Sequence, residues 1–79
     1  MALKQTFGFL GAGRMATALA GGMVKAGLIK SRQLVASDVV PAASKRFAKT
    51  TGGKSLKGNV QVLRKANVIV VAVKPHQAL

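Results

Sequence analysis

The chain has 79 residues, which is enough for one small domain near the lower size limit for a core without disulfides or metals. It contains thirteen Lys and Arg residues, one acidic residue and no Cys, for a formal net charge of +12. Disulfides and thiolate metal sites are therefore excluded, and a single Asp with a single His leaves no carboxylate pair, catalytic triad or metal cage. We expect no catalytic or metal-binding residues, so any chemistry must come from a bound cofactor or from parts that are missing.

The shortage of acids is a feature in itself. Average composition predicts roughly ten acidic residues at this length. Glu, Cys, Trp and Tyr are all absent, which suggests a reduced or engineered alphabet, with an unusually basic natural fragment as the alternative. In either case the positive field attracts polyanions.

The first predicted strand, Thr6–Leu10, runs into a Gly-x-Gly-x-x-Ala turn at residues 11–16. Gly11 allows a tight turn, Gly13 lets a pyrophosphate approach the backbone, and Ala16 lets the next helix pack closely on the strand. The first N–H groups of that helix favour an anion. This order of strand, turn and helix is typical of a dinucleotide-binding unit, although a glycine turn that only joins two elements is the alternative.

A helix is predicted from Arg14 to about Ala26, because apolar residues recur at helical spacing and Gly27 suits a left-handed stop. The predicted inward stripe consists of Ala16, Leu19, Ala20, Met23 and Val24. Gly21 and Gly22 lie inside this helix, where they suggest close contact with the sheet or else a weak point.

The second predicted strand is Gln33–Ser37, followed by a helix over roughly Ala42–Thr50 with Ala43 and Phe47 facing inward. Its basic residues, Lys45, Arg46 and Lys49, are expected on a solvated face.

Lys54–Leu56 can form only a minimal third strand, and Asn59 is expected to cap a short helix that ends near Lys65. The β-branched run Val68–Val73 predicts a central strand that is buried on both faces, and Lys74-Pro75 ends it.

Alternating strands and helices predict an α/β fold with a four-stranded parallel sheet in the order 3-2-1-4 and flanking helices. This is a Rossmann-like half-domain, and we expect residues 1–79 to form a single domain without a substrate or dimerisation domain. No apolar stretch is long enough to span a bilayer, so we expect a soluble, cytoplasmic chain.

Three segments resemble the N-terminal domain of pyrroline-5-carboxylate reductase, the NAD(P)H-dependent enzyme of the last step of proline synthesis. They are residues 8–16 (GFLGAGRMA), 18–22 (ALAGG) and 72–75 (AVKP). The resemblance covers essentially the whole chain but only about the first third of a full-length family member. Gln61 and Asn67 depart from the family, because its members often carry acids at these positions.

The resemblance also implies where a dinucleotide would lie. The pyrophosphate would be held by Gly11, Ala12, Gly13, Arg14 and Met15. Ser37 would lie at the adenosine ribose or its 2′-phosphate, and Asn59 near the adenine. The nicotinamide-side ribose would be lined by Ala72, Val73, Lys74 and Pro75.

Asp38 lies where an acid would bind the ribose 2′-OH of NAD, and capping of the next helix is the alternative. Ser37, with Lys45 and Arg46 nearby, would suit a 2′-phosphate, whereas Asp38 would repel one. On the family resemblance and the positive field of the chain, NADP(H) is slightly preferred over NAD(H). Arg14 could contact a phosphate or could equally be solvated.

The leading hypothesis is an NAD(P)(H)-binding half-domain that is not catalytic alone. The alternative is a basic module that binds nucleic acid or other polyanions non-specifically, since no Tyr or Trp is available for base stacking. Homo-oligomerisation through exposed sheet edges is a further expectation.

Overall fold

The computed structural model describes residues 4–72, which form a small α/β sandwich. The elements in chain order are β1 (Phe7–Leu10), α1 (Arg14–Lys25), the short 3₁₀ helix η1 (Ser31–Gln33), β2 (Leu34–Ser37), α2 (Pro41–Thr51), β3 (Lys54–Ser55), α3 (Asn59–Lys65) and β4 (Val68–Val71). Every strand and helix predicted from the sequence is present within a few residues of its expected limits. Val73, the predicted end of the last strand, lies outside the described residues.

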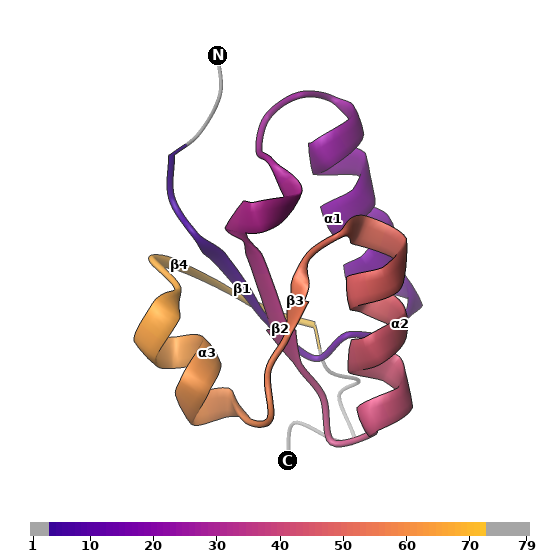
Figure 1. Cartoon of the computed structure of the whole chain (residues 1–79), viewed down its shortest axis with the longest axis vertical. Helices are drawn as coiled ribbons and strands as arrows, with labels where there is room; N and C mark the ends of the chain where they lie inside the picture. Colours follow the sequence, from indigo (N-terminus) through magenta and orange to yellow (C-terminus); the bar gives the residue numbers. More distant parts are fainter. Residues whose placement is uncertain (1–3, 73–79) are drawn as a thin grey trace.

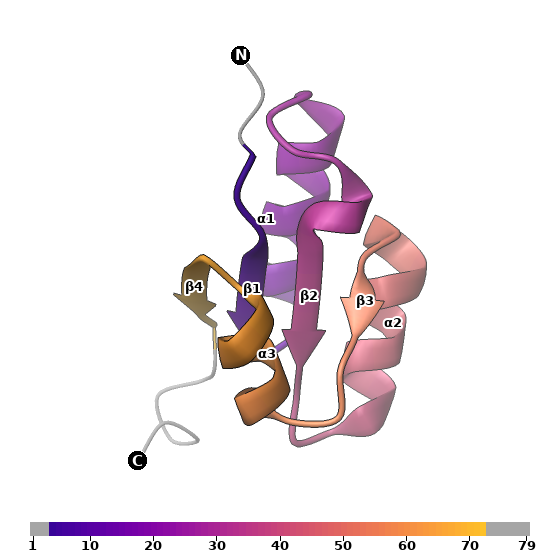
Figure 2. The same cartoon turned by 60° about the vertical axis from the view of Figure 1, so that its left-hand side comes forward.

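The four strands form one sheet in the order β3-β2-β1-β4, and each neighbouring pair is parallel. The predicted Rossmann-like half-domain is therefore confirmed. Helices α1 and α2 cover one face of the sheet, and α3 covers the other (Figures 1 and 2). Because the strands are parallel, the loops that follow β1 and β2 lie at the same end of the sheet as Ala72, which directly follows β4.

The main core lies between the sheet and the α1/α2 layer. Phe9 of β1 and Phe47 of α2 are fully buried, and their ring centroids are 5.3 Å apart. The rest of this cluster consists of a third phenylalanine and smaller apolar side chains, namely Phe7, Ala12, Ala16, Ala20, Ile29, Leu34 and Ala36. The predicted inward stripe of α1 is therefore correct except at Leu19, which is exposed.

The opposite face of β1 is covered by α3 at very short range. A methyl group added at Gly8 would lie 2.5 Å from Cγ1 of Val62 and 2.6 Å from Cβ of Ala66. Non-bonded carbon atoms do not approach each other this closely. The absence of a side chain at Gly8 is therefore what allows α3 to pack against the sheet.

The prediction that the last strand is central and buried on both faces is wrong. β4 is an edge strand that pairs with β1 alone among the residues described, and Ile69 and Val71 are 36% and 66% exposed. The β-branched run gave the correct element, but burial depends on the neighbours that the sheet order supplies.

Close contact of Gly21 and Gly22 with the sheet is also wrong. A Cβ at either position would meet nothing within 4 Å, since both glycines lie on the side of α1 that faces away from the core. Their place on the helix is explained by a pocket described below.

Candidate dinucleotide-binding site

The glycine turn lies at the carboxyl edge of the sheet, between the ends of β1 and β2. Gly11 has φ of 103°, a backbone conformation that side chains rarely tolerate, and its N–H donates to the carbonyl of Ser37 at 2.9 Å. On the other side of β1, the N–H of Ala72 donates to the carbonyl of Leu10 at 2.9 Å. The end of β1 and its turn are thus hydrogen-bonded to the end of β2 on one side and to Ala72, directly after β4, on the other.

Asp38 fastens the same turn through its side chain. Its Oδ2 accepts the N–H of Ala12 at 2.7 Å, and its Oδ1 accepts the N–H of Val40 at 2.8 Å. The N-cap of α2 is Val40, and no side chain caps that helix. Capping of the next helix by Asp38 is therefore wrong, because the carboxylate turns back toward the glycine turn.

The first turn of α1 presents N–H groups that the helix itself cannot pair. Its N-cap is Gly13, and no side chain bonds to the cap position. A Cβ at Gly13 would have no neighbour within 4 Å, so the space beside this backbone is open. A side chain at this position would fill it, which is the geometry expected of a cradle for a diphosphate.

Ser37 and Asn59 lie together on the α3 side of the sheet. The hydroxyl of Ser37 donates to Oδ1 of Asn59 at 2.6 Å, and Ser37 is 1% exposed. Asn59 is the first residue of α3, whereas the N-cap is Gly58 without a side-chain bond. The predicted cap role of Asn59 is thus wrong, because its side chain pairs with Ser37 instead.

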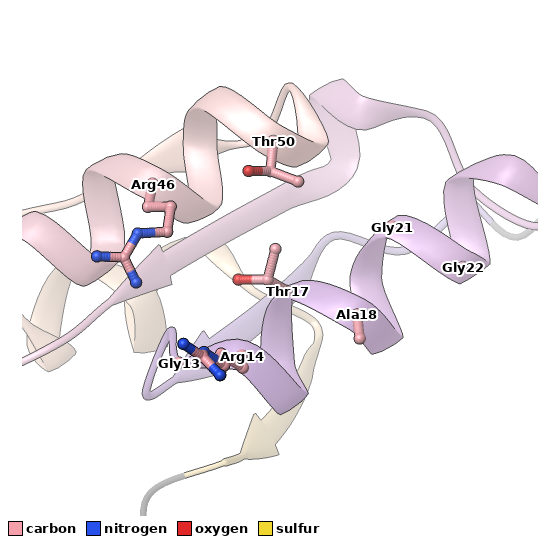
Figure 3. Close-up of a pocket in the computed structure, with 8 residues that line it drawn as sticks. All are labelled: Gly13, Arg14, Thr17, Ala18, Gly21, Gly22, Arg46 and Thr50. Carbon is pink, nitrogen blue, oxygen red and sulfur yellow. The ribbon is translucent and has the colours of Figure 1, made fainter.

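A pocket of about 360 Å³ lies between α1 and α2 on the outer side of the sandwich. Figure 3 shows its lining, which consists of Gly13, Arg14, Thr17, Ala18, Gly21 and Gly22 from α1, and Arg46 and Thr50 from α2. The two arginines lie toward the Gly13 end, and the hydroxyl of Thr17 points to that end as well (Figure 3).

The sequence of α1 contains a second pattern at helical spacing that indicates this pocket, in addition to the apolar stripe that predicted its inward face. Residues 14, 17, 18, 21 and 22 follow helical spacing too, and four of the five have small side chains. Such a stripe leaves room on the outer face of α1, so Gly21 and Gly22 belong to the pocket. Arg46, expected to be merely solvated, is exposed and also lines it.

The remaining predicted site residues are distributed as follows. Met15 is 80% exposed at the start of α1, and Ala72 is half-buried beside the end of β1. Val73, Lys74 and Pro75 lie outside the described residues. Asn67, one of the two departures from the family pattern, accepts the N–H of Thr6 through Oδ1 at 3.0 Å.

A family model described as NADP oxidoreductase, coenzyme F420-dependent, matches residues 6–79. The chain belongs to this family. The resemblance to pyrroline-5-carboxylate reductase is confirmed by curated relatives with that name. The protein from Methanosarcina acetivorans is 35% identical over 73 residues, covering 92% of this chain and 27% of the relative. The protein from Pisum sativum is 37% identical over 71 residues, covering 90% and 26%.

Solved structures agree with this membership in the oxidoreductase family. A pyrroline-5-carboxylate reductase from Coxiella burnetii superposes with a TM-score of 0.83 at 27% identity, over 95% of this chain and 27% of that one. An imine reductase variant from Myxococcus stipitatus in complex with NAD⁺ gives 0.75 at 25% identity, over 96% and 24%. The chain therefore spans about a quarter of the length of the relatives that it matches.

Within residues 4–72, no helix combines the length and the apolar character that crossing a membrane would require.

Proposed function

We propose that this chain binds NAD(P)(H), with the diphosphate held at the turn formed by Gly11, Ala12 and Gly13 and by the first residues of α1, Arg14 and Met15. The open space beside Gly13 is the observation that carries the proposal. It adjoins uncapped N–H groups at the start of α1 on a strongly basic chain, so charge and space favour the same ligand. The imine reductase relative solved with NAD⁺ adds support.

The role proposed for the chain is to bind and orient the cofactor. When bound, a nicotinamide cofactor supplies hydride chemistry, and the protein contributes its position. Ala72, Val73, Lys74 and Pro75 would line the nicotinamide-side ribose, and Asn59 would lie near the adenine. We propose that reduction of pyrroline-5-carboxylate needs the further length present in the relatives, so that this chain alone is not catalytic.

We further propose a slight preference for NADP(H) over NAD(H). The thirteen basic residues support it, because a 2′-phosphate adds negative charge to the ligand. Asp38 opposes it, since a carboxylate near the ribose repels that phosphate. Non-specific binding of nucleic acid, the alternative function, finds no support in the family match or in these relatives.

Self-association is proposed through the outer edge of β4. This edge carries the exposed Ile69 and Val71, and the neighbouring outer face of α3 carries the exposed Val60 and Leu63. An uncovered edge strand offers backbone groups to a second strand. A cytoplasmic location is also proposed, and the absence of Cys is consistent with a reducing compartment.

Gly13→Val tests the cofactor site. Because a Cβ at this position has no protein neighbour within 4 Å, we expect the variant to fold normally while its branched side chain fills the diphosphate cradle. Titration calorimetry with NADH should show saturable binding by the parent chain and at least about a tenfold loss in the variant, the size expected for about 1.4 kcal/mol.

Gly22→Val is the matched control, since it adds the same side chain to another open position of α1. It should retain NADH binding. Equal NADH affinity in Gly13→Val and the parent, with both folded by circular dichroism, would contradict the proposed site.

A further inference from the structure

We propose that Met15 is a site of reversible oxidation, and that its sulfoxide weakens dinucleotide binding at the start of α1. The inference rests on the proposed function, because it assigns a regulatory modification to the same site. The oxidant is hydrogen peroxide. The thioether sulfur gains one oxygen atom and is oxidised by two electrons, while the O–O bond of the peroxide breaks and water is released.

Exposure distinguishes the two methionines of α1. Met15 is 80% exposed in the first turn, whereas Met23 is half-buried and packs against the core cluster. Both belong to the same helix, so they differ in burial while sharing a backbone conformation. Because the peroxide must reach the sulfur, Met15 is the residue of the two that reacts first.

Met15 also lies among the N–H groups that the proposed diphosphate would contact. The N–H of Thr17 donates to the carbonyl of Gly13 at 2.9 Å, which is the first bond of the helical ladder. The N–H groups of Arg14, Met15 and Ala16 come before it, so the helix itself supplies them with no acceptor. No side chain caps the helix at Gly13 either. A diphosphate bound to these groups lies in the same helical turn as the Met15 side chain.

Oxidation makes this side chain unfavourable to an anion. The sulfoxide oxygen carries partial negative charge and accepts hydrogen bonds, whereas the thioether is apolar. At the positive end of α1 the sulfoxide therefore repels a diphosphate and competes with it for the N–H groups of the first turn. Methionine sulfoxide reductase restores the thioether, so the change in affinity is reversible.

The test treats the parent chain, Met15→Leu and Met23→Leu with hydrogen peroxide, and removes the peroxide before NADH is titrated by calorimetry. Met1, which lies outside the described residues, is present in all three proteins and is therefore matched. After peroxide, the parent and Met23→Leu should bind NADH about fivefold more weakly, the size of an interaction of about 1 kcal/mol at a helix N-terminus. Met15→Leu should change by less than about twofold.

Two further measurements follow the reaction itself. Trypsin releases residues 15–25 as one peptide, in which fragment ions in mass spectrometry separate the two methionines. We expect Met15 to be oxidised before Met23. ADP-ribose carries the diphosphate without the dihydronicotinamide ring that peroxide could oxidise, and it should slow the oxidation of Met15 while leaving that of Met23 unchanged.

The outcomes separate this modification from the function on which it rests. Equal losses of NADH affinity in the two variants, oxidation of Met23 as fast as Met15, or absence of protection by ADP-ribose would each overturn the proposal while leaving dinucleotide binding intact. Failure of the untreated parent chain to bind NADH saturably would overturn the proposed function and the effect of oxidation with it. A loss in the parent that methionine sulfoxide reductase reverses, with Met15→Leu resistant, supports both.

Discussion

Asp38 shows how far a single residue can be interpreted from sequence. It is the only acidic residue of the chain, and its position after the second strand marked it as a ribose ligand or a helix cap. In the structure its side chain accepts the backbone N–H groups of Ala12 and Val40, which lie in two different turns. Ala12 is 26 residues away in sequence, so this pairing depends on the parallel packing of β1 against β2 and has no local signature.

Asp38→Asn should destabilise the fold, because the amide group keeps one acceptor oxygen and loses the other. One of the two backbone N–H groups would then face an NH₂ group, at a loss of about 1–3 kcal/mol in the free energy of unfolding. Urea denaturation measures this difference. A loss that disappears in roughly 0.5 M salt would assign the effect to net charge, because salt screens charge but leaves the hydrogen bond in place.

At the scale of elements, the order of strands and helices could be predicted because it follows from local periodicity and glycine turns. The burial of each element was predicted less accurately than the order of the elements. The run at Val68 has the composition of a strand buried on both faces, yet β4 lies at the edge of the described sheet, as the predicted strand order 3-2-1-4 already implied. Likewise, Asn59 has the chemistry of a cap, but the chain places it beside Ser37. In each case a neighbour distant in sequence decides the outcome.

The glycines of β1 and α1 lie in opposite surroundings, because a side chain at Gly8 would meet close neighbours whereas one at Gly22 would meet none within 4 Å. A pair of variants can test this difference. Gly8→Ala should destabilise by about 1–3 kcal/mol, because the added methyl overlaps atoms of Val62 and Ala66 and forces α3 away from the sheet. Gly22→Ala should stabilise by about 1 kcal/mol, since alanine is the better helix former and its methyl enters open space.

Thermal and urea unfolding of both variants measure these two changes. A Gly8→Ala chain as stable as the parent would show that α3 does not pack directly on β1. A destabilised Gly22→Ala chain would show that the outer face of α1 is more crowded than the pocket allows.

For the molecule as a whole, charge opposes compaction. Thirteen basic residues are opposed by one carboxylate, which is already bonded to backbone amides. Mutual repulsion therefore acts on the folded chain and, between molecules, on any pairing of β4 edges. The resemblance in sequence predicted the fold and the family correctly, whereas the charge balance is a property of this particular chain.

Raising phosphate from about 10 mM to about 150 mM should increase the melting temperature, because the Debye length shortens and anions collect on the basic surface. Sodium chloride matched in ionic strength separates screening from phosphate binding. Sedimentation over the same range should show association growing with salt if β4 edges pair. A melting temperature that stays constant or falls would contradict this account of the charge.

The tie between Asp38 and the glycine turn has a consequence for recognition. The hydrogen bond between Asp38 and Ala12 keeps the loop in one conformation before a ligand binds, so little conformational entropy is lost on binding. In the proposed dinucleotide site, the start of α1 would therefore be a rigid binding surface that selects ligands by their match to its fixed shape and charge.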